Sequence, residues 1–313
     1  MGTVHDTVSI IRRRVSALGP GRWLLAVSGG MDSMVLLAAA ADSLDRGNLT
    51  VATFDHGTGP AATTAATLVG RRARELGVLC IAGRARTAGR TESEWRDERW
   101  AFLRSAARGI GSRVVTAHTL DDQVETVFIR ALRGAGPRGL AGLYAQSPVA
   151  RPLIGTTRAE IQGYATAQNI VFVTDPSNAD LRHLRNRVRL QLLPAMERAS
   201  PGFRLAMLEI AEKASSWRAQ MEALALTFPM MSDSPQNHSF QRSSLRGFPV
   251  DSLKSVWPAL SARAGVVLDR RGTDRLAAFT IEGETGQQIQ LSGGVTVQLD
   301  RQSITFRTTA THG

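Results

Sequence analysis

Residues 24–37 read Leu-Leu-Ala-Val-Ser-Gly-Gly-Met-Asp-Ser-Met-Val-Leu-Leu, and this stretch predicts the fold of the chain. Leu24–Val27 is a short apolar run, typical of a buried parallel strand, and Met34–Ala41 is rich in good helix formers. Between them, Gly29 and Gly30 allow a tight turn and a close approach of the backbone to a ligand. A strand, a glycine turn and a new helix form an anion site, because the first N–H groups of the helix are unpaired.

The polar residues of this turn favour a polyphosphate. Ser28 and Ser33 supply hydroxyl donors on either side of the glycines. Asp32 would repel phosphate unless a cation lay between them, so it indicates bound Mg²⁺. An ordinary glycine turn capped by Asp or Ser is the alternative, but the six residues together favour a nucleotide-binding loop. The loop is neither a Walker A motif nor Gly-x-Gly-x-x-Gly.

Composition limits the class of protein. The 313 residues, 43% of them hydrophobic, allow one large domain or two. No run of about 18 apolar residues occurs, so no membrane span is expected. Cys80 is the only cysteine, which excludes a disulfide within the chain and a cysteine-held metal cluster, and fits a reducing cytoplasm.

The chain is strongly basic, with a formal net charge of +11. Of its 38 lysines and arginines, only Lys213 and Lys254 are lysines. A genome-wide preference for arginine codons would explain that ratio but not the net charge. The charge therefore favours a nucleic-acid partner.

Short apolar runs alternate with helical segments over the first two thirds of the chain. This alternation predicts an α/β fold with a doubly wound, mostly parallel sheet. We expect strands at residues 24–27, 49–54, 78–82, 113–117 and 170–173, and a strand-like piece ending at 150–154.

A second motif, residues 117–126, reads Ala-His-Thr-Leu-Asp-Asp-Gln-Val-Glu-Thr. His118 ends a predicted strand, and Asp122 and Glu125 share one face of the helix that follows. Two acids that face a cleft can bind Mg²⁺ or take a proton from an attacking amine. The alternative is that the aspartates, Asp121 included, cap the helix and that His118 is a core histidine.

Arginines gather in three further places. Arg96 and Arg99 share a face of the helix expected at the end of residues 84–108, where acidic partners in solvent are an equal alternative to RNA. Arg133 and Arg138 flank a glycine-rich loop at 134–143, which could admit a bulky partner or be a plain connector. Arg182, Arg185 and Arg189 form one helical stripe without interleaved acids, which favours phosphate contact.

Beyond Pro194 the pattern changes to a long helix at 203–226, a polar loop at 229–240, helices at 253–264 and 270–279, and three short strands at 288–291, 295–299 and 303–306. No catalytic cluster is visible there. We therefore predict a catalytic domain at 1–198 and a smaller α+β domain at 199–313 that positions the substrate.

The Ser-Gly-Gly-x-Asp-Ser loop resembles that of the N-type ATP pyrophosphatases, or PP-loop enzymes. With the other motifs, over roughly residues 22–194, the chain resembles the tRNA(Ile)-lysidine synthetase family. The residues that carry this resemblance are Ser28–Ser33, His56, Glu92, Arg96, Arg99, His118, Asp121, Asp122, Glu125, Thr126, the loop from Gly134, Arg151–Leu153, Asp175–Asn178, Arg185, Asn186 and Arg189. The thiolation enzymes that share the second motif carry paired cysteines, which this chain lacks.

The resemblance implies ATP and Mg²⁺ as cofactors, and free L-lysine and the anticodon loop of tRNA(Ile) as partners. The family adenylates the wobble cytidine of a CAU anticodon and then ligates lysine to its C2. The ATP-binding residues would be Ser28, Gly29, Gly30, Met31, Asp32, Ser33 and His118. The catalytic residues would be Asp32, Asp122 and Glu125, with Mg²⁺ near Asp32 and Asp122. The tRNA-binding residues would be Arg96, Arg99, Arg133, Arg138, Arg185 and Arg189.

One departure and several alternatives remain. The family continues its second-strand histidine into Gly-Leu-Arg, whereas His56 is followed by Gly57-Thr58-Gly59, so an arginine of the 84–90 group is expected to replace the missing one. Another PP-loop enzyme, either tRNA-modifying or of the amidotransferase type, is the nearest alternative. A basic RNA-binding protein with a degenerate nucleotide site is a more distant one. The sequence leaves the choice between monomer and homodimer open.

Overall fold

The computed structural model describes residues 4–57, 59–85, 92–234 and 237–308. The chain divides into two compact units, Met1–Ser215 and Ser216–Gly313. Helix α10 (Phe203–Leu226) runs through this division. Within the described residues, no helix combines the length and the apolar character that a membrane crossing requires.

Unit 1 is built on a parallel four-stranded sheet in the order β3-β2-β1-β4. Its strands are β1 (Trp23–Ala26), β2 (Leu49–Asp55), β3 (Leu79–Arg84) and β4 (Arg113–Val115). Its helices before α10 are α1 (Val4–Ser16), α2 (Met31–Ser43), α3 (Pro60–Glu75), α4 (Glu92–Gly109), α5 (Leu120–Leu132), α6 (Pro137–Leu140), α7 (Arg158–Ala167), α8 (Leu184–Arg187) and α9 (Leu193–Ala199). The predicted doubly wound α/β fold is confirmed.

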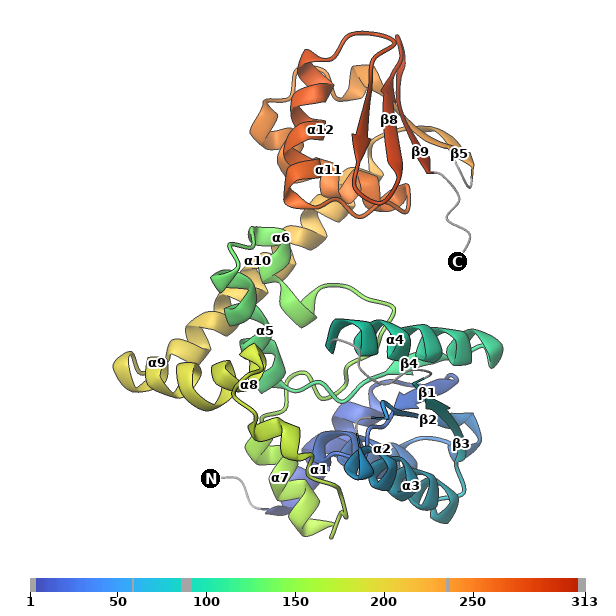
Figure 1. Cartoon of the computed structure of the whole chain (residues 1–313), viewed down its shortest axis with the longest axis vertical. Helices are drawn as coiled ribbons and strands as arrows, with labels where there is room; N and C mark the ends of the chain where they lie inside the picture. The colour runs from blue at the N-terminus through green and yellow to red at the C-terminus, as the bar shows by residue number, and fades with distance from the viewer. Residues whose placement is uncertain (1–3, 58, 86–91, 235–236, 309–313) are drawn as a thin grey trace. The chain divides into compact units, whose positions relative to one another are not determined.

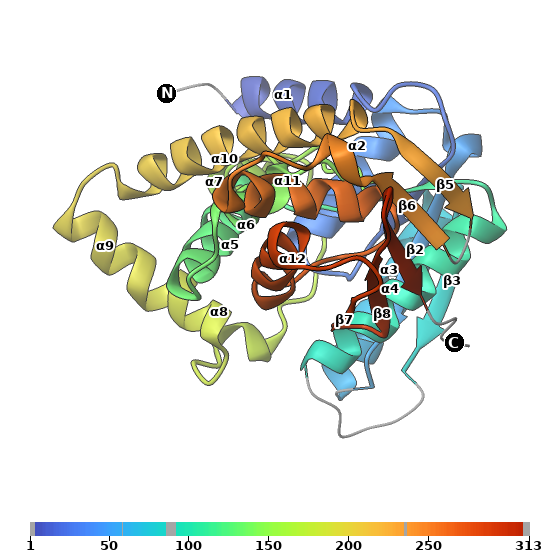
Figure 2. The ribbon, with the colours of Figure 1, turned by 90° about the horizontal axis from the view of Figure 1, so that it is seen from above.

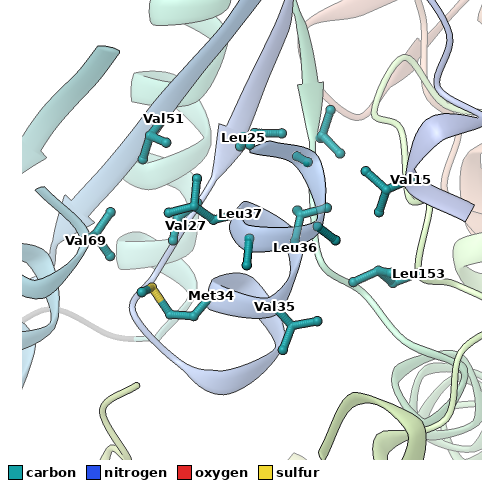
Figure 3. Packing of buried hydrophobic residues seen from close by; sticks show 14 of the residues in the cluster. Val15, Leu25, Val27, Met34, Val35, Leu36, Leu37, Val51, Val69 and Leu153 are labelled. Carbon is teal, nitrogen blue, oxygen red and sulfur yellow. The ribbon is translucent and has the colours of Figure 1, made fainter. Parts of the chain in front are cut away.

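Successive apolar side chains of β1 and β2 point to opposite faces of the sheet, so helices cover both faces. Leu25 and Val51 face the helical layer of α2 and α3, with α1 and α7 packed behind it. Leu24 and Ala52 face the opposite layer, where α4 contributes Leu103. Helix α2 is apolar on nearly all sides, which fits its place between the sheet and the outer helices (Figures 1 and 3).

Three local predictions in unit 1 are wrong. Residues 170–173 form no strand; instead, the Val173 N–H donates to the Gly29 carbonyl oxygen at 2.9 Å. In the segment 150–154 only Ala150 pairs, through a single bridge to Val115. The loop predicted at 134–143 contains the short helix α6, which begins at Pro137 because proline suits the first turn of a helix.

A π-helical turn, Val188–Leu192, separates α8 from α9. Pro194 accounts for it, because its ring lacks an N–H and would clash with the carbonyl of Leu190 in a regular helix. The predicted arginine stripe is therefore broken. Arg182 lies before α8 and pairs with Asp180, whereas Arg185 and Arg189 lie on α8 and on the π-helical turn.

Unit 2 contains an antiparallel five-stranded sheet in the order β5-β6-β9-β8-β7. Its strands are β5 (Met230–Ser234), β6 (Asn237–Gln241), β7 (Gln288–Leu291), β8 (Val295–Leu299) and β9 (Ser303–Thr308). Helices α11 (Val250–Arg263) and α12 (Arg270–Glu282) cover one face around buried Trp257 (Figure 2). The predicted α+β character of this part is confirmed.

The prediction of a polar loop at 229–240 is wrong, because this segment forms β5 and most of β6. Its Ser, Asp and Asn residues resemble a loop, but β6 pairs with β9 over five residues. Phe240 is the apolar residue that fixes β6 on the sheet, since it is buried against Trp257 and Phe306. Tertiary pairing thus overrides a weak local preference.

Candidate active site

The glycine loop lies between β1 and α2, at the carboxyl end of the sheet. Gly29 has φ +87°, and a Cβ there would lie 2.8 Å from the Cβ of Ala65, so glycine is required on both counts. Ser33 Oγ accepts the Ser28 N–H at 3.1 Å and donates to the Gly30 carbonyl at 2.9 Å. Gly30 is the N-cap and brings no side-chain acceptor, so the first N–H groups of α2 are available to an anion.

The loop opens into a cavity of about 670 Å³. It is a suitable size for a nucleotide. Strand ends, α4, α5, α7 and the segment 172–178 line the cavity along with the loop. The polar side chains among the lining residues are Ser28, Asp32, Ser33, His56, Arg99, Thr116, His118, Asp122, Arg158, Gln162, Thr174, Asp175, Asn178 and Arg189.

Asp32 is the acidic residue of the loop itself. Its Oδ1 atom is buried and has no hydrogen-bond partner within the described chain. Burial raises the pKa of its carboxyl, Asp122 adds to this effect, and the charges of Arg158 and Arg189 oppose it. A buried oxygen of this kind is suited to a cation that arrives together with phosphate.

His118 lies at the end of β4 and lines the same cavity. Its Nδ1 is 2.8 Å from the Thr116 hydroxyl. Burial lowers the pKa of His118 to about 4, so the imidazole is neutral near pH 7. A neutral ring can accept or donate one hydrogen bond to a nucleotide without adding charge.

Asp122, Glu125, Arg185 and Arg189 form an ion-pair cluster. Arg185 contacts Asp122 at 2.7 Å and Glu125 at 2.8 Å, and Arg189 contacts Glu125 at 2.5 Å. Glu125 is only 1% exposed. Burial raises the pKa of Asp122, but Arg185 and the Thr119 N–H outweigh it, so that the pKa is lowered. The cluster holds two negative charges in place beside the cavity.

The other predicted arginines are more dispersed. Arg99 lines the cavity, and its buried Nε has no partner among the described residues, while Arg96, on the same helix, is exposed. Arg133 caps the C-terminus of α5 in an exposed position, and Arg138 is half-buried on α6. The structure thus brings Arg99 and Arg189 to the cavity, but not Arg96, Arg133 or Arg138.

An arginine of the 84–90 group was expected to replace the one that the family carries after its second-strand histidine, and the structure describes only Arg84 of this group. Arg84 lies 3.8 Å from Asp55, so it already has a partner. Arg86 and Arg90 lie outside the described residues, and so does Thr58.

Sequence reasoning missed several residues of the site. Gln123, fully buried, donates to the Ala141 carbonyl and accepts the Leu143 N–H, which fixes the glycine-rich segment against α5. Asp121, which belongs to the second motif of the sequence, accepts the Arg158 N–H at 2.7 Å and pairs with Arg204; these two partners were not predicted. Arg158 and Gln162 both face the cavity from α7. They are four residues apart and so share a face of the helix, which was the available signal.

A family model described as a PP-loop domain matches residues 6–196. The tRNA(Ile)-lysidine synthase of Leifsonia xyli is 32% identical over 293 residues, with 90% of this chain and 88% of that protein aligned. The chain belongs to the tRNA(Ile)-lysidine synthase family of PP-loop proteins. The sequence-based resemblance is confirmed. We refer to the Ser28–Ser33 turn, one of the motifs that carry it, as the PP-loop.

Other members of the family match over shorter stretches. The tRNA(Ile)-lysidine synthase of Gloeobacter violaceus is 41% identical over 60% of this chain and 62% of its own length. The enzyme of Pseudomonas aeruginosa is 38% identical over 60% of this chain and 46% of its own length. These two alignments therefore span less than two thirds of the relatives.

Among solved structures, the U34-tRNA thiolase NcsA from Methanococcus maripaludis superposes with a TM-score of 0.56. The superposition covers 68% of this chain and 80% of the thiolase at 14% sequence identity. At this identity the likeness supports the PP-loop fold alone.

Proposed function

We propose that this protein ligates free lysine to C2 of the wobble cytidine of tRNA(Ile) bearing a CAU anticodon, with ATP converted to AMP and pyrophosphate. The observation that carries the proposal is that one cavity is lined both by the PP-loop and by Asp122 of the Asp122–Glu125 cluster. The adenylating step needs an anion site such as the PP-loop, and the attacking amine needs the acids of the cluster.

ATP would lie on the PP-loop, with its phosphates at the N–H groups of α2 and its base toward His118. Two features support this placement: the N-terminus of α2 is uncapped, and His118 is neutral. Mg²⁺ fits beside Asp32, whose Oδ1 is buried and unpartnered, with Asp122 as a second candidate ligand. When bound, Mg²⁺ would neutralise phosphate charge. No group of three or more His, Cys, Asp or Glu side chains placed for a metal occurs among the described residues, so the phosphates would complete the coordination.

In the first step, cytidine O2 attacks the α-phosphate, which forms the O–P bond of an adenylated base and releases pyrophosphate. The cytidine must leave its stack to reach the cavity, as single-stranded RNA recognition generally requires. In the second step, the ε-amine of lysine attacks C2, and AMP leaves with the oxygen.

The lysine amine starts protonated, with a pKa near 10.4, so it needs a negative site and a proton acceptor. Asp122 and Glu125 supply the negative charge, and either carboxylate is a candidate acceptor of the proton. Arg185 and Arg189 hold the acid cluster, and this positioning role supplements the tRNA contact predicted for them.

For tRNA we assign Arg99 to the cavity mouth and Arg96, Arg133 and Arg138 to the outer contacts. Residues 199–313 are proposed to position the tRNA body. A tRNA-modifying enzyme of this kind would work in the cytoplasm, as a monomer or a homodimer.

The decisive experiment is incorporation of labelled lysine into tRNA(Ile) with a CAU anticodon, with ATP and Mg²⁺. The initiator tRNA(Met), which has the same anticodon, is the control. Label in tRNA(Ile) alone is expected. Consumption of ATP that depends on tRNA, without label, would point instead to another nucleophile. The absence of both lysine label and ATP turnover would overturn the proposal.

A further inference from the structure

Three arginines line the cavity, and they differ in what they already contact. Arg189 is paired with Glu125 at 2.5 Å. Arg99 lies beside His56, whose pKa is lowered by burial and then by the charge of Arg99. The guanidinium of Arg158 makes no hydrogen bond or ion pair within the described chain, although its charge acts on Asp32. Arg99 also has a buried Nε without a partner among the described residues, so both side chains are uncommitted cations. Of the two, Arg158 is the one whose charge acts on Asp32, the acid of the PP-loop.

The backbone of Arg158 is fixed, even though its side chain is free. Thr157 and Glu160 form a reciprocal capping box, with the Thr157 N–H donating to Glu160 at 2.7 Å. The Arg158 N–H donates to Asp121 at 2.7 Å, which fastens the start of α7 to the start of α5. A long cationic side chain on a rigid base can reach an incoming anion at little cost in backbone order.

The elements around Arg158 place it next to the loop. Helix α7 packs against α2, the helix whose N-terminus the loop forms. The segment that follows α7 returns to the loop, where the Val173 N–H donates to the Gly29 carbonyl. Gln162, one turn after Arg158, adds an amide donor to the same wall of the cavity. An anion on the loop would thus face α2 on one side and this wall on the other.

We propose that Arg158 binds the β- and γ-phosphates of ATP and so holds the departing pyrophosphate. The proposal rests on the proposed adenylating function. It assigns a guanidinium, which binds phosphate oxygens bidentately, to the end of the nucleotide that carries the most charge.

The test compares binding of ATP, pyrophosphate and AMP to the full-length protein by calorimetry in Mg²⁺ buffer. Arg158→Ala should weaken ATP and pyrophosphate binding by about 10- to 100-fold, the range of one charge-assisted contact, and leave AMP binding nearly unchanged. Arg158→Gln should behave in the same way. Both variants keep the backbone N–H that Asp121 accepts, so the fold should be retained. Arg13→Ala, which removes an exposed arginine of α1, is the matched control.

Unchanged ATP and pyrophosphate affinities would overturn the assignment. Equal losses for AMP and ATP would also overturn it, because Arg158 would then act on the α-phosphate or on the fold. Absence of ATP binding to the wild-type protein would remove the proposed function and this assignment together. If the phosphate-specific loss occurs but no lysine is transferred to tRNA(Ile), only the lysine-ligating function fails.

Discussion

At the scale of single residues, Asp32 combines the two properties that define the site. It is buried, with an oxygen that lacks a partner among the described residues, and burial raises the pKa of its carboxyl. Asp32→Asn keeps the shape and removes the charge. We expect tRNA-dependent AMP formation to fall about 100-fold or more, since the variant can no longer hold a cation against phosphate.

The same change should not lower the free energy of unfolding, because it removes a charge whose burial is unfavourable. Chemical denaturation of the variant and the wild type measures this. Full AMP formation by Asp32→Asn would refute the role assigned to the carboxylate. A large loss of stability would show that Asp32 has structural partners.

His118 provides a pH-dependent prediction. Its pKa is about 4 in the folded protein, against an ordinary value of 6.5, so the unfolded chain binds the proton more readily between these values. The contribution of His118 to stability is therefore complete above pH 6.5 and is lost as the pH falls toward 4, with a slope of at most about 1.4 kcal/mol per pH unit. Denaturation curves of His118→Asn should show a shallower decline than those of the wild type, and identical slopes would contradict the assignment.

A substitution at Gly29 would show how much the PP-loop depends on the left-handed backbone at this position. Alanine there adds left-handed strain of about 1–2 kcal/mol and a clash with Ala65, so Gly29→Ala should unfold more easily and bind ATP weakly. The double variant Gly29→Ala/Ala65→Gly removes the closest contact, at 2.8 Å, but keeps the approach to the carbonyl oxygen of residue 65 at 3.0 Å and the left-handed strain. It should recover part of the stability, as measured by thermal denaturation. Full recovery would show that the φ angle of Gly29 is not limiting.

At the scale of elements, the pairing of α5 with α8 and the π-helical turn depends on Glu125. Its carboxylate is buried between Arg185 and Arg189, so Glu125→Gln leaves Asp122 to balance the charge of two guanidinium groups. We expect a loss of about 3 kcal/mol in the free energy of unfolding. Glu75→Gln, in an exposed pair with Arg72, should cost less than about 1 kcal/mol. Equal effects of the two changes would mean that the cluster contributes no more than a surface pair.

The elements predicted correctly from the sequence are those defined by their own residues, through hydrophobic periodicity or a glycine turn. The strand 24–27, the glycine turn and the helix 203–226 are strongly periodic or punctuated by glycine, and the structure reproduces them within about a residue. Strands β5 and β6 were missed, because their hairpin is stabilised by pairing with β9, far along the chain, rather than by its own residues. Arg158 was missed for a related reason: its spacing from Gln162 marks a polar face of α7, but only the packing of α7 beside α2 places that face at the cavity.

At the scale of the whole molecule, the net charge of +11 predicts salt-dependent binding of tRNA. Raising the salt concentration from 50 to 200 mM should weaken tRNA binding by about 100-fold or more, since each neutralised phosphate releases counterions. Binding of ATP with Mg²⁺ should change much less over the same range. Filter binding at several salt concentrations measures both, and a flat tRNA curve would contradict a role for the basic surface.

The strand order of unit 2 has a consequence for synthesis on the ribosome. Strand β9 (Ser303–Thr308) is the middle strand of the sheet, and it joins the β5–β6 hairpin to the β7–β8 hairpin. Translation therefore delivers both hairpins before the strand that unites them. At about 5–20 residues per second, the nascent β5–β6 hairpin waits several seconds with an open edge. A premature stop codon before Ser303 would remove β9 and leave the two hairpins of unit 2 without the strand that joins them.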